Sequence, residues 1–284
     1  SMKVKGFSKS MIQNTLTCLQ GAMNYAILPL KYIQANPCVA VKIGKMPMDM
    51  TAKAHTEYIC SAEEFNQILK RFPADNCFHL SLVVPYNTGT RIGETFAIDL
   101  SQDVDFEKHE LRIHGQMQKV EKTWYIKPPK YDSYRTIKMG VTLEKELKFA
   151  IQQRRINKLK YGGAYLKTYL LPDHSIAQIR ADIDVPYKEI LPLCVKENGA
   201  LLTPDSFKYC ARIIHYELNN PLFHAHCLRH THGTILAENG VNPKTVMERL
   251  GHKDITTTLQ TYTFNTDAMQ QTAVDVFENA IQTQ

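Results

Sequence analysis

The sequence predicts a mainly α-helical protein with a small antiparallel β-sheet, an α+β fold. Segments with an apolar stripe at helical spacing, flanked by helix-capping residues, recur along most of the chain. Convincing strand patterns are confined to residues 110–139. Hydrophobic residues make up 44% of the 284 positions, which is enough for a sizeable core in one large or two modest domains.

The first predicted helix covers residues 8–34, with Ser8 or Ser10 as its cap. We expect it to end at Ala35-Asn36-Pro37, because proline disfavours helical geometry in the residue before it. Residues 38–56 show no periodicity and are interpreted as a linker to the main domain.

The main domain is predicted to begin near Tyr58 with a capping box at residues 61–64 and a helix over residues 65–71. A strongly apolar helix over residues 80–87 follows and ends at Thr88-Gly89-Thr90-Arg91-Ile92-Gly93-Glu94. Glycines bracket one arginine there, and the helix resumes from Glu94 to Ile98.

Three strands are predicted over residues 110–120, 123–127 and 134–139, as one antiparallel meander. The turn between the last two strands holds Lys130, for which a solvated turn lysine is the competing interpretation. A charged amphipathic helix over residues 143–159, with caps at Thr142 and Gly162, comes next. Residues 160–200 are expected to be loop-like, and a helix follows over residues 203–218, capped by Thr203 or Asp205.

A helix over residues 226–238 places His226, Arg229 and His230 on one face, at i, i+3 and i+4. No acidic residue shares that face, so it favours an anionic group, and phosphate is the obvious candidate. His224 and His232 are expected at the surface or behind the site.

The last quarter of the chain has clear signals for where helices begin and end. Asn242-Pro243 starts a helix that Gly251 ends. Asp254 is predicted to cap a short segment that reaches Tyr262. Asn265 or Thr266 then opens a last helix, whose apolar stripe consists of Met269, Ala273, Val276, Phe277, Ala280 and Ile281.

Composition bounds the function only loosely. A net charge of +6 and a pI near 8.8 lean mildly toward nucleic acid and fit an ordinary basic surface equally well. Seven scattered cysteines without a C-x-x-C pair suggest reduced thiols in a cytosolic protein. No apolar run could span a membrane and no signal peptide is visible.

These residues together suggest phosphoryl transfer. Arg91 and Arg229 could each grip two phosphate oxygens and stabilise a five-coordinate phosphorus. Tyr262 could then attack as a nucleophile, with Lys130 or an imidazole protonating the leaving oxygen. The arginines supply the positive charge, so neither a metal nor another cofactor is expected.

Structural alternatives exist for each residue. An arginine in a turn is usually a surface salt-bridge partner, and a tyrosine is more often a packed aromatic. His226 and His230 could bind zinc, but the glutamate of an H-E-x-x-H motif is missing.

The motif order resembles that of the tyrosine recombinases, the phage integrase family, over roughly residues 8–284. The resemblance is carried by Thr88–Glu94, by His226-Cys227-Leu228-Arg229-His230-Thr231, by Leu250-Gly251-His252 and by Tyr262. The style of residues 240–252 is similar to integrases of Gram-positive phages and conjugative transposons. The implied fold is a tyrosine-recombinase catalytic domain preceded by part of a helical core-binding domain.

The resemblance implies a role for each matching residue. Arg91 and Arg229 would clamp the scissile phosphate, and His252 would hydrogen-bond to it. Lys130 would protonate the leaving 5′ oxygen, and His226 would act as acid or base. Tyr262 would attack and form a 3′-phosphotyrosine. Two further positions would support the site, namely Glu94 and His230.

The resemblance also implies domains and partners. Residues 1–52 would be a partial core-binding domain with its linker, residues 53–265 the catalytic domain, and residues 266–284 a helix that packs on a neighbouring subunit. Partners would be double-stranded DNA at recombination sites, further copies of the chain as a dimer to tetramer on DNA, and an excisionase or host DNA-bending protein. We expect a bacterial, cytoplasmic, nucleoid-associated enzyme of a mobile element, without a membrane partner.

Two departures and three rivals accompany this hypothesis. The family's full core-binding domain and an amino-terminal arm-binding domain are not recognisable, so we expect a truncated or shortened relative. A type IB topoisomerase-like enzyme would relax DNA by the same chemistry. A catalytically silent DNA-binding regulator and, more distantly, a metal hydrolase are the others.

Overall fold

The structure is a computed structural model that describes residues 2, 5–44, 58–253, 271, 272, 274, 275 and 278. The chain divides into two compact units, residues 1–56 and residues 57–284. None of the helices within the described ranges is long and apolar enough to cross a membrane. All seven cysteines are free thiols.

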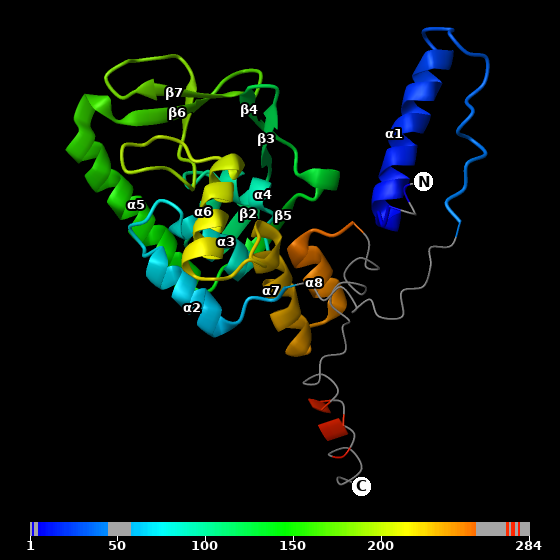
Figure 1. Cartoon of the computed structure of the whole chain (residues 1–284). Coiled ribbons are helices and arrows are strands. Elements are labelled where there is room, and N and C mark those ends of the chain that lie inside the picture. Colours follow the sequence, from blue (N-terminus) through cyan, green and yellow to red (C-terminus); the bar gives the residue numbers. More distant parts are fainter. Residues whose placement is uncertain are drawn as a thin grey trace. The chain divides into compact units, whose positions relative to one another are not determined.

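The first unit contains one helix, α1 (Lys9–Ile27), whose first turn is capped when Ser8 accepts a hydrogen bond from the Met11 amide. The helix is shorter than predicted. It ends at Ile27 because Pro29 follows and holds Leu28 in an extended conformation. The chain then turns back along α1 (Figure 1), and Gln20 donates a hydrogen bond to the Cys38 carbonyl.

The second unit begins with α2 (Ala62–Arg71), which opens with the predicted capping box between Ser61 and Glu64. Helix α3 (His79–Thr88) is almost wholly buried and ends at Gly89, whose φ of 69° is left-handed. Helix α4 (Ile92–Ala97) starts directly after Arg91.

The predicted meander is wrong, because residues 110–120 are two strands that belong to two different sheets. Strands β1 (Val104–Asp105), β2 (Glu110–Ile113) and β5 (Arg135–Lys138) form one antiparallel sheet. Strands β3 (Gln116–Val120) and β4 (Thr123–Lys127) form a separate hairpin. The chain changes sheet at Gly115, where a Cβ would lie 2.9 Å from a methyl carbon of Ile126.

Residues 160–200 are not loop-like, which corrects another expectation. Strands β6 (Leu166–Leu170), β7 (Ile176–Arg180) and β8 (Lys188–Ile190) form an antiparallel sheet in the order β7-β6-β8. Each strand is short and only partly buried, so its apolar alternation is weak. Hydrogen bonds between strands hold this sheet together, and no local sequence pattern predicts them.

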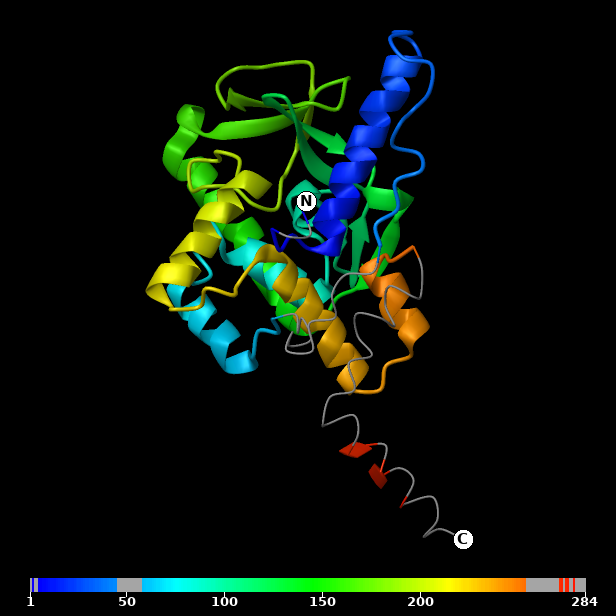
Figure 2. The ribbon, with the colours of Figure 1, turned by 45° about the vertical axis from the view of Figure 1, so that its right-hand side comes forward.

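The remaining helices enclose the core. Helix α5 (Val141–Tyr161) is capped by Gly140 and Gly162, not by Thr142, and is followed by the short 3-10 turn Gly162–Ala164. Helices α6 (Pro204–Glu217), α7 (Ala225–Glu238) and α8 (Pro243–Leu250) complete the unit. Helix α7 packs on α3, and α8 lies beside both α7 and β5, as two views agree (Figure 1, Figure 2).

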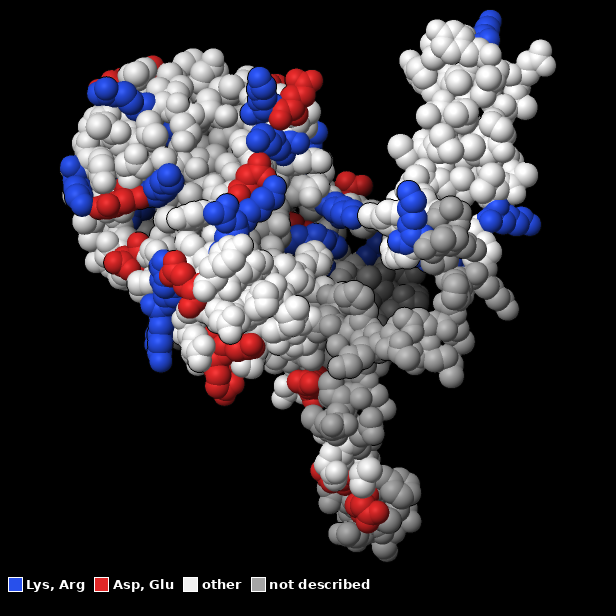
Figure 3. Space-filling view, viewed as in Figure 1, with Lys and Arg blue, Asp and Glu red and all other residues white. Residues whose placement is uncertain are grey.

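Basic and acidic side chains alternate over one face of the second unit (Figure 3). Many charged side chains of this unit form exposed ion pairs, such as Arg180 with Asp182 at 2.6 Å and Lys160 with Glu197 at 2.5 Å. Exposed pairs contribute little to stability. The net positive charge is therefore not gathered into one patch on this face.

Candidate active site

Arg91 is positioned by the bend between α3 and α4. Gly89 ends α3 in a left-handed conformation, and a Cβ there would lie 2.3 Å from a side-chain carbon of Leu250. The Arg91 guanidinium then reaches three groups: Glu94 Oε1 at 2.7 Å, the Gly251 carbonyl at 3.0 Å and Ser133 Oγ at 3.4 Å. These contacts join the α3–α4 bend to the turn before β5 and to the end of α8.

Arg229 approaches the same bend from α7. Its side chain is buried, and its Nη1 donates a hydrogen bond of 2.7 Å to the Gly89 carbonyl. Gly89 is two residues before Arg91, so the two arginines predicted to act together are held at one bend. They are 138 positions apart in the chain (229 minus 91).

Three histidines surround this pair. The rings of His226 and His230 lie edge to face with centroids 5.3 Å apart, as the i, i+4 spacing predicts. Burial and the charges of Arg229, His230 and Arg91 lower the pKa of His226 to about 4. Burial and the charges of Arg229, Arg91 and His230 lower the pKa of His252 to about 3. The same arginines thus act on imidazoles from α7 and from the end of α8.

Glu94 supplies the carboxylate beside these arginines, and its side chain is fully buried. Arg91 donates to both carboxylate oxygens, from its guanidinium to one at 2.7 Å and from its backbone amide to the other at 2.9 Å. The Arg135 guanidinium also donates to both, at 2.8 and 3.3 Å. Burial acts to raise the pKa of Glu94, but Arg135 and Arg91 outweigh it and hold that pKa below its usual range. Glu94 therefore stays charged and holds both guanidinium groups in place.

Sequence reasoning missed a network behind these residues. Arg135 Nε donates to the Arg249 carbonyl at 2.8 Å, and Arg249 Nε donates to His232 Nε2 at 2.9 Å. The other ring nitrogen of His232 donates to the Tyr86 carbonyl at 2.9 Å, which fixes a neutral tautomer. The local sequence shows only that Arg135 is at the start of a strand and that Arg249 comes two residues before Gly251. Neither position indicates its partner.

Lys130 lies in the predicted turn between β4 and β5, in a single 3-10 turn (Lys130–Asp132). Its side chain is exposed, with Nζ 4.9 Å from the ring centroid of Tyr131. Within residues 58–253, no hydrogen bond joins it to Arg91, Arg229 or the histidines. Ser133, three residues later, ties this turn to Arg91.

Tyr262 lies outside the described residues, as do Asp254, Asn265, Thr266 and the apolar stripe of the last helix. The described positions of that helix, Gln271, Thr272, Val274, Asp275 and Glu278, are helical. Next to the cluster, a groove of about 710 Å³ runs between β5 and α8 and is lined by Ser133, Arg135, Met247, Gly251 and His252.

The cluster has an excess of positive charge. Arg91, Arg135 and Arg229 carry three charges, and Glu94 neutralises one of them. Two guanidinium groups beside neutral imidazoles can bind an oxyanion and move protons next to it. Among the described residues, no three His, Cys, Asp or Glu side chains come together as metal ligands.

Comparison with known proteins agrees with this geometry. Residues 60–269 match the model of the phage integrase family. This match covers more than half of the chain, so the protein belongs to the phage integrase family. Within that family, the chain is similar to tyrosine recombinases and to integrases of mobile elements.

Two curated relatives illustrate the similarity. A tyrosine recombinase XerC-like protein of Caldanaerobacter subterraneus subsp. tengcongensis is 27% identical over 285 residues, covering 97% of this chain and 67% of that protein. The ICEBs1 integrase of Bacillus subtilis is 25% identical over 261 residues, covering 90% of this chain and 62% of that protein. The chain spans about two thirds of the length of such relatives.

Solved structures share the fold. The Tn1549 transposon integrase in complex with transposon right end DNA has a TM-score of 0.66 at 24% identity, covering 96% of this chain and 81% of that chain. The XerA recombinase has a TM-score of 0.53 at 18% identity, covering 95% and 77%. The predicted fold class, a tyrosine-recombinase catalytic domain with helices and small antiparallel sheets, is confirmed.

Proposed function

We propose that this chain is a site-specific DNA recombinase of a mobile element, and that it cuts and rejoins DNA through a 3′-phosphotyrosine. The observation that carries the proposal is that Arg91 and Arg229 meet at the bend between α3 and α4, where Arg229 donates to the Gly89 carbonyl and Arg91 follows two residues later. The charges of both arginines lower the pKa values of His226 and His252. A DNA phosphodiester is the anion that this donor set fits. The Tn1549 integrase, a similar structure, was solved in complex with transposon DNA.

The two guanidinium groups would hold the non-bridging oxygens of the scissile phosphate. They would stabilise the charge that builds up as phosphorus becomes five-coordinate. The Tyr262 oxygen would form a bond to phosphorus while the bond from phosphorus to the 5′ oxygen breaks. One phosphoester replaces another, so rejoining would need no ATP.

Two protons move in this step. The proton of the Tyr262 hydroxyl would pass to His226, which is uncharged near neutral pH because its pKa is lowered to about 4. The leaving 5′ oxygen would take a proton from Lys130. His252, whose pKa is lowered to about 3, would donate a hydrogen bond to the phosphate as a neutral imidazole.

The nucleophile is tested by trapping the covalent intermediate on a DNA duplex nicked near the cleavage site. We expect a protein–DNA adduct that withstands denaturing detergent, and none with Tyr262→Phe. An adduct of equal yield from that variant would overturn the assignment. Plasmid relaxation without sequence preference would favour the topoisomerase alternative, and DNA binding without any adduct would favour the regulator.

The role of Lys130 as general acid is tested on DNA with a better leaving group, a 5′-bridging phosphorothiolate, because sulfur leaves without protonation. Lys130→Ala should lose cleavage of ordinary DNA and regain it on this substrate. Lys127→Ala is the matched control, since Lys127 is also in this region, at the end of β4. Rescue of the Lys127 variant alone would move the role to that residue.

The domain boundaries and partners are part of the proposal. Residues 1–52 would contribute part of a core-binding domain, residues 53–265 would catalyse, and residues 266–284 would pack on a neighbouring subunit. Deleting 266–284 should impair assembly on DNA more than binding of one subunit, and equal assembly would refute this. An excisionase or a host DNA-bending protein would assist on bacterial nucleoid DNA.

A further inference from the structure

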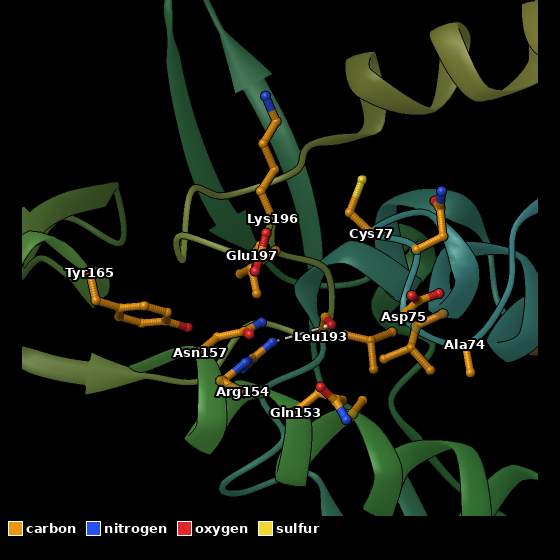
Figure 4. A pocket seen from close by; sticks show the side chains of 14 residues that line it. Ala74, Asp75, Cys77, Gln153, Arg154, Asn157, Tyr165, Leu193, Lys196 and Glu197 are labelled. Atoms are coloured by element: carbon orange, nitrogen blue, oxygen red, sulfur yellow. Dashed lines mark hydrogen bonds between the residues drawn. The ribbon is translucent and has the colours of Figure 1, made fainter. Parts of the chain in front are cut away.

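A second cavity lies in the other half of the unit, between α5, the loop before α3 and the turn at residues 194–202 (Figure 4). Its volume is about 320 Å³, and none of its lining residues belongs to the arginine–histidine cluster. Leu80, Ala150 and Leu193 supply an apolar lining. Polar side chains come from α5 and from Tyr165, just before β6.

Arg154 on α5 is the unusual group in this lining. Its Nη2 donates to the Pro192 carbonyl at 2.5 Å. Its Nη1 is buried and has no hydrogen-bond partner in the part of the chain that the structure describes. No ion pair joins this guanidinium to a described carboxylate. A buried polar group without a partner is costly, so this nitrogen needs an acceptor that the described chain does not supply, either a water or a ligand oxygen.

Other donors face the same space. Figure 4 shows the Tyr165 hydroxyl and the Asn157 side chain pointing toward Arg154. The Tyr165 ring is buried, and Arg154 lies close enough for its charge to oppose the rise that burial causes in the pKa of Tyr165. A guanidinium, a phenol and an amide therefore converge on one cavity.

Some of the charged side chains around the cavity form ion pairs, and others do not. Of the two lining acids, Glu197 is already paired with Lys160 at 2.5 Å. Asp75 is exposed and lies in the loop before α3. Lys196 adds a second cation to the lining, and no described carboxylate forms an ion pair with it. Arg154 and Lys196 are therefore the lining cations that form no ion pair with a described carboxylate.

We propose that this cavity binds a small organic anion, either a carboxylate or a phosphate monoester with a compact apolar remainder. Its oxyanion would accept hydrogen bonds from Arg154, Tyr165 and Asn157, because a guanidinium presents donors in the geometry that such oxyanions match. Its remainder would lie against Leu80 and Leu193. A protein cavity of about 150 Å³ already holds benzene, so the volume here accommodates a ring with an anionic head group.

The proposal is tested by isothermal titration calorimetry on the full chain without DNA. The probes are benzoate and phenyl phosphate, one for each source of the oxyanion. Benzyl alcohol and benzylamine are the neutral and cationic controls. We expect saturable binding of at least one anion and none of either control. Absence of binding by both anions would mean that only water occupies the cavity, and equal binding of benzyl alcohol would mean an apolar site; either result overturns the proposal.

Variants separate an anion site from a structural arginine. Arg154→Gln should weaken binding roughly ten- to a hundredfold, as expected for a hydrogen bond to a charged group. Tyr165→Phe and Asn157→Leu, which leave the Arg154–Pro192 hydrogen bond in place, should each weaken it severalfold. Asp75→Asn should strengthen binding of the anion, since it removes a negative charge from the exposed edge of the cavity.

The last two kinds of variant keep the proposal falsifiable if Arg154→Gln fails to fold. Unchanged affinity in Tyr165→Phe and Asn157→Leu, or weaker binding in Asp75→Asn, would refute an anion site here. The measurement needs neither DNA nor Tyr262. Its failure would therefore leave the proposed recombinase function untouched.

Discussion

Arg135 is the residue whose removal best tests how the active site is held. It donates to both carboxylate oxygens of Glu94, to the Ser133 carbonyl at 3.1 Å and to the Arg249 carbonyl at 2.8 Å. These contacts join the α3–α4 bend, the turn before β5 and the end of α8. Arg135→Met keeps much of the side-chain volume and removes every donor.

The expected cost follows from the burial of Glu94, whose side chain is 0% exposed. Removing one partner of a buried ion pair costs about 3–5 kcal/mol, because the remaining charge is poorly solvated. Arg91 still contacts Glu94, so we expect a value near the lower end, about 3 kcal/mol. For a unit of this size, that loss lowers the melting temperature by roughly 6–12 °C.

The assay is chemical denaturation of the single variants Arg135→Met and Glu94→Gln and of the double variant. Because the two residues contact each other, the cost of the double variant should be less than the sum of the single costs by at least about 1 kcal/mol. Additive costs, or a loss below about 1 kcal/mol in Arg135→Met, would refute the argument. Lys138→Met, at the exposed last position of the same strand and three residues from Arg135, is the matched control and should change stability by less than about 0.5 kcal/mol.

The same pair predicts a pH dependence. The pKa of Glu94 is held below its usual range in the folded state, so its contribution to stability is complete above the unfolded pKa. That contribution is lost as the pH falls through the folded pKa. Without Arg135, the folded pKa rises toward the unfolded value, so the stability advantage of the wild type over the variant should shrink as the pH falls below the unfolded pKa of about 4.3. Chemical denaturation at several pH values measures this, and an advantage that stays constant with pH would contradict it.

Three further predictions concern other parts of the unit. Gly89→Ala should cost about 1–2 kcal/mol for its left-handed backbone, plus about 1–3 kcal/mol for the clash with Leu250, as measured by denaturation. Gly140→Ala, with open space around it and an extended backbone, should cost less than about 1 kcal/mol, the difference between glycine and alanine at a helix N-cap. The hydrogen bond of His114 to buried Asp103 raises the pKa of His114, so its contribution to stability should be present below about pH 6.5 and lost as the pH rises through the folded pKa; a His114→Gln variant with the same pH profile as the wild type would contradict this. The association constant for duplex DNA should fall steeply and log-linearly with salt concentration, and a slope near zero would exclude binding through phosphate contacts.

Local patterns predicted the elements that form within a few residues. The cap at Ser61 and the stop at Gly89 each lie where their residue type requires. The start at Asn242 and the stop at Gly251 also agree with the structure. Capping acts over three or four residues, so such signals survive whatever the rest of the chain does.

Patterns failed where pairing is long-range. The strands over residues 160–200 were missed, and β2 and β3 were merged into one. Strand partners are chosen by hydrogen bonds and side-chain contacts across a sheet, and short strands carry weak alternation of their own. The helix predicted to residue 34 failed for a local reason, since Pro29 ends it after Ile27.

By itself, the sequence determined the order of the motifs, the bend that carries Arg91 and the helix face shared by His226, Arg229 and His230. These features follow from chain geometry over one or two helical turns. Only the tertiary structure decided that Arg135, 41 positions from Glu94 and 114 from Arg249, joins those motifs from behind. A buried charge must find its partner wherever the fold brings one, and no spacing in the sequence records that choice.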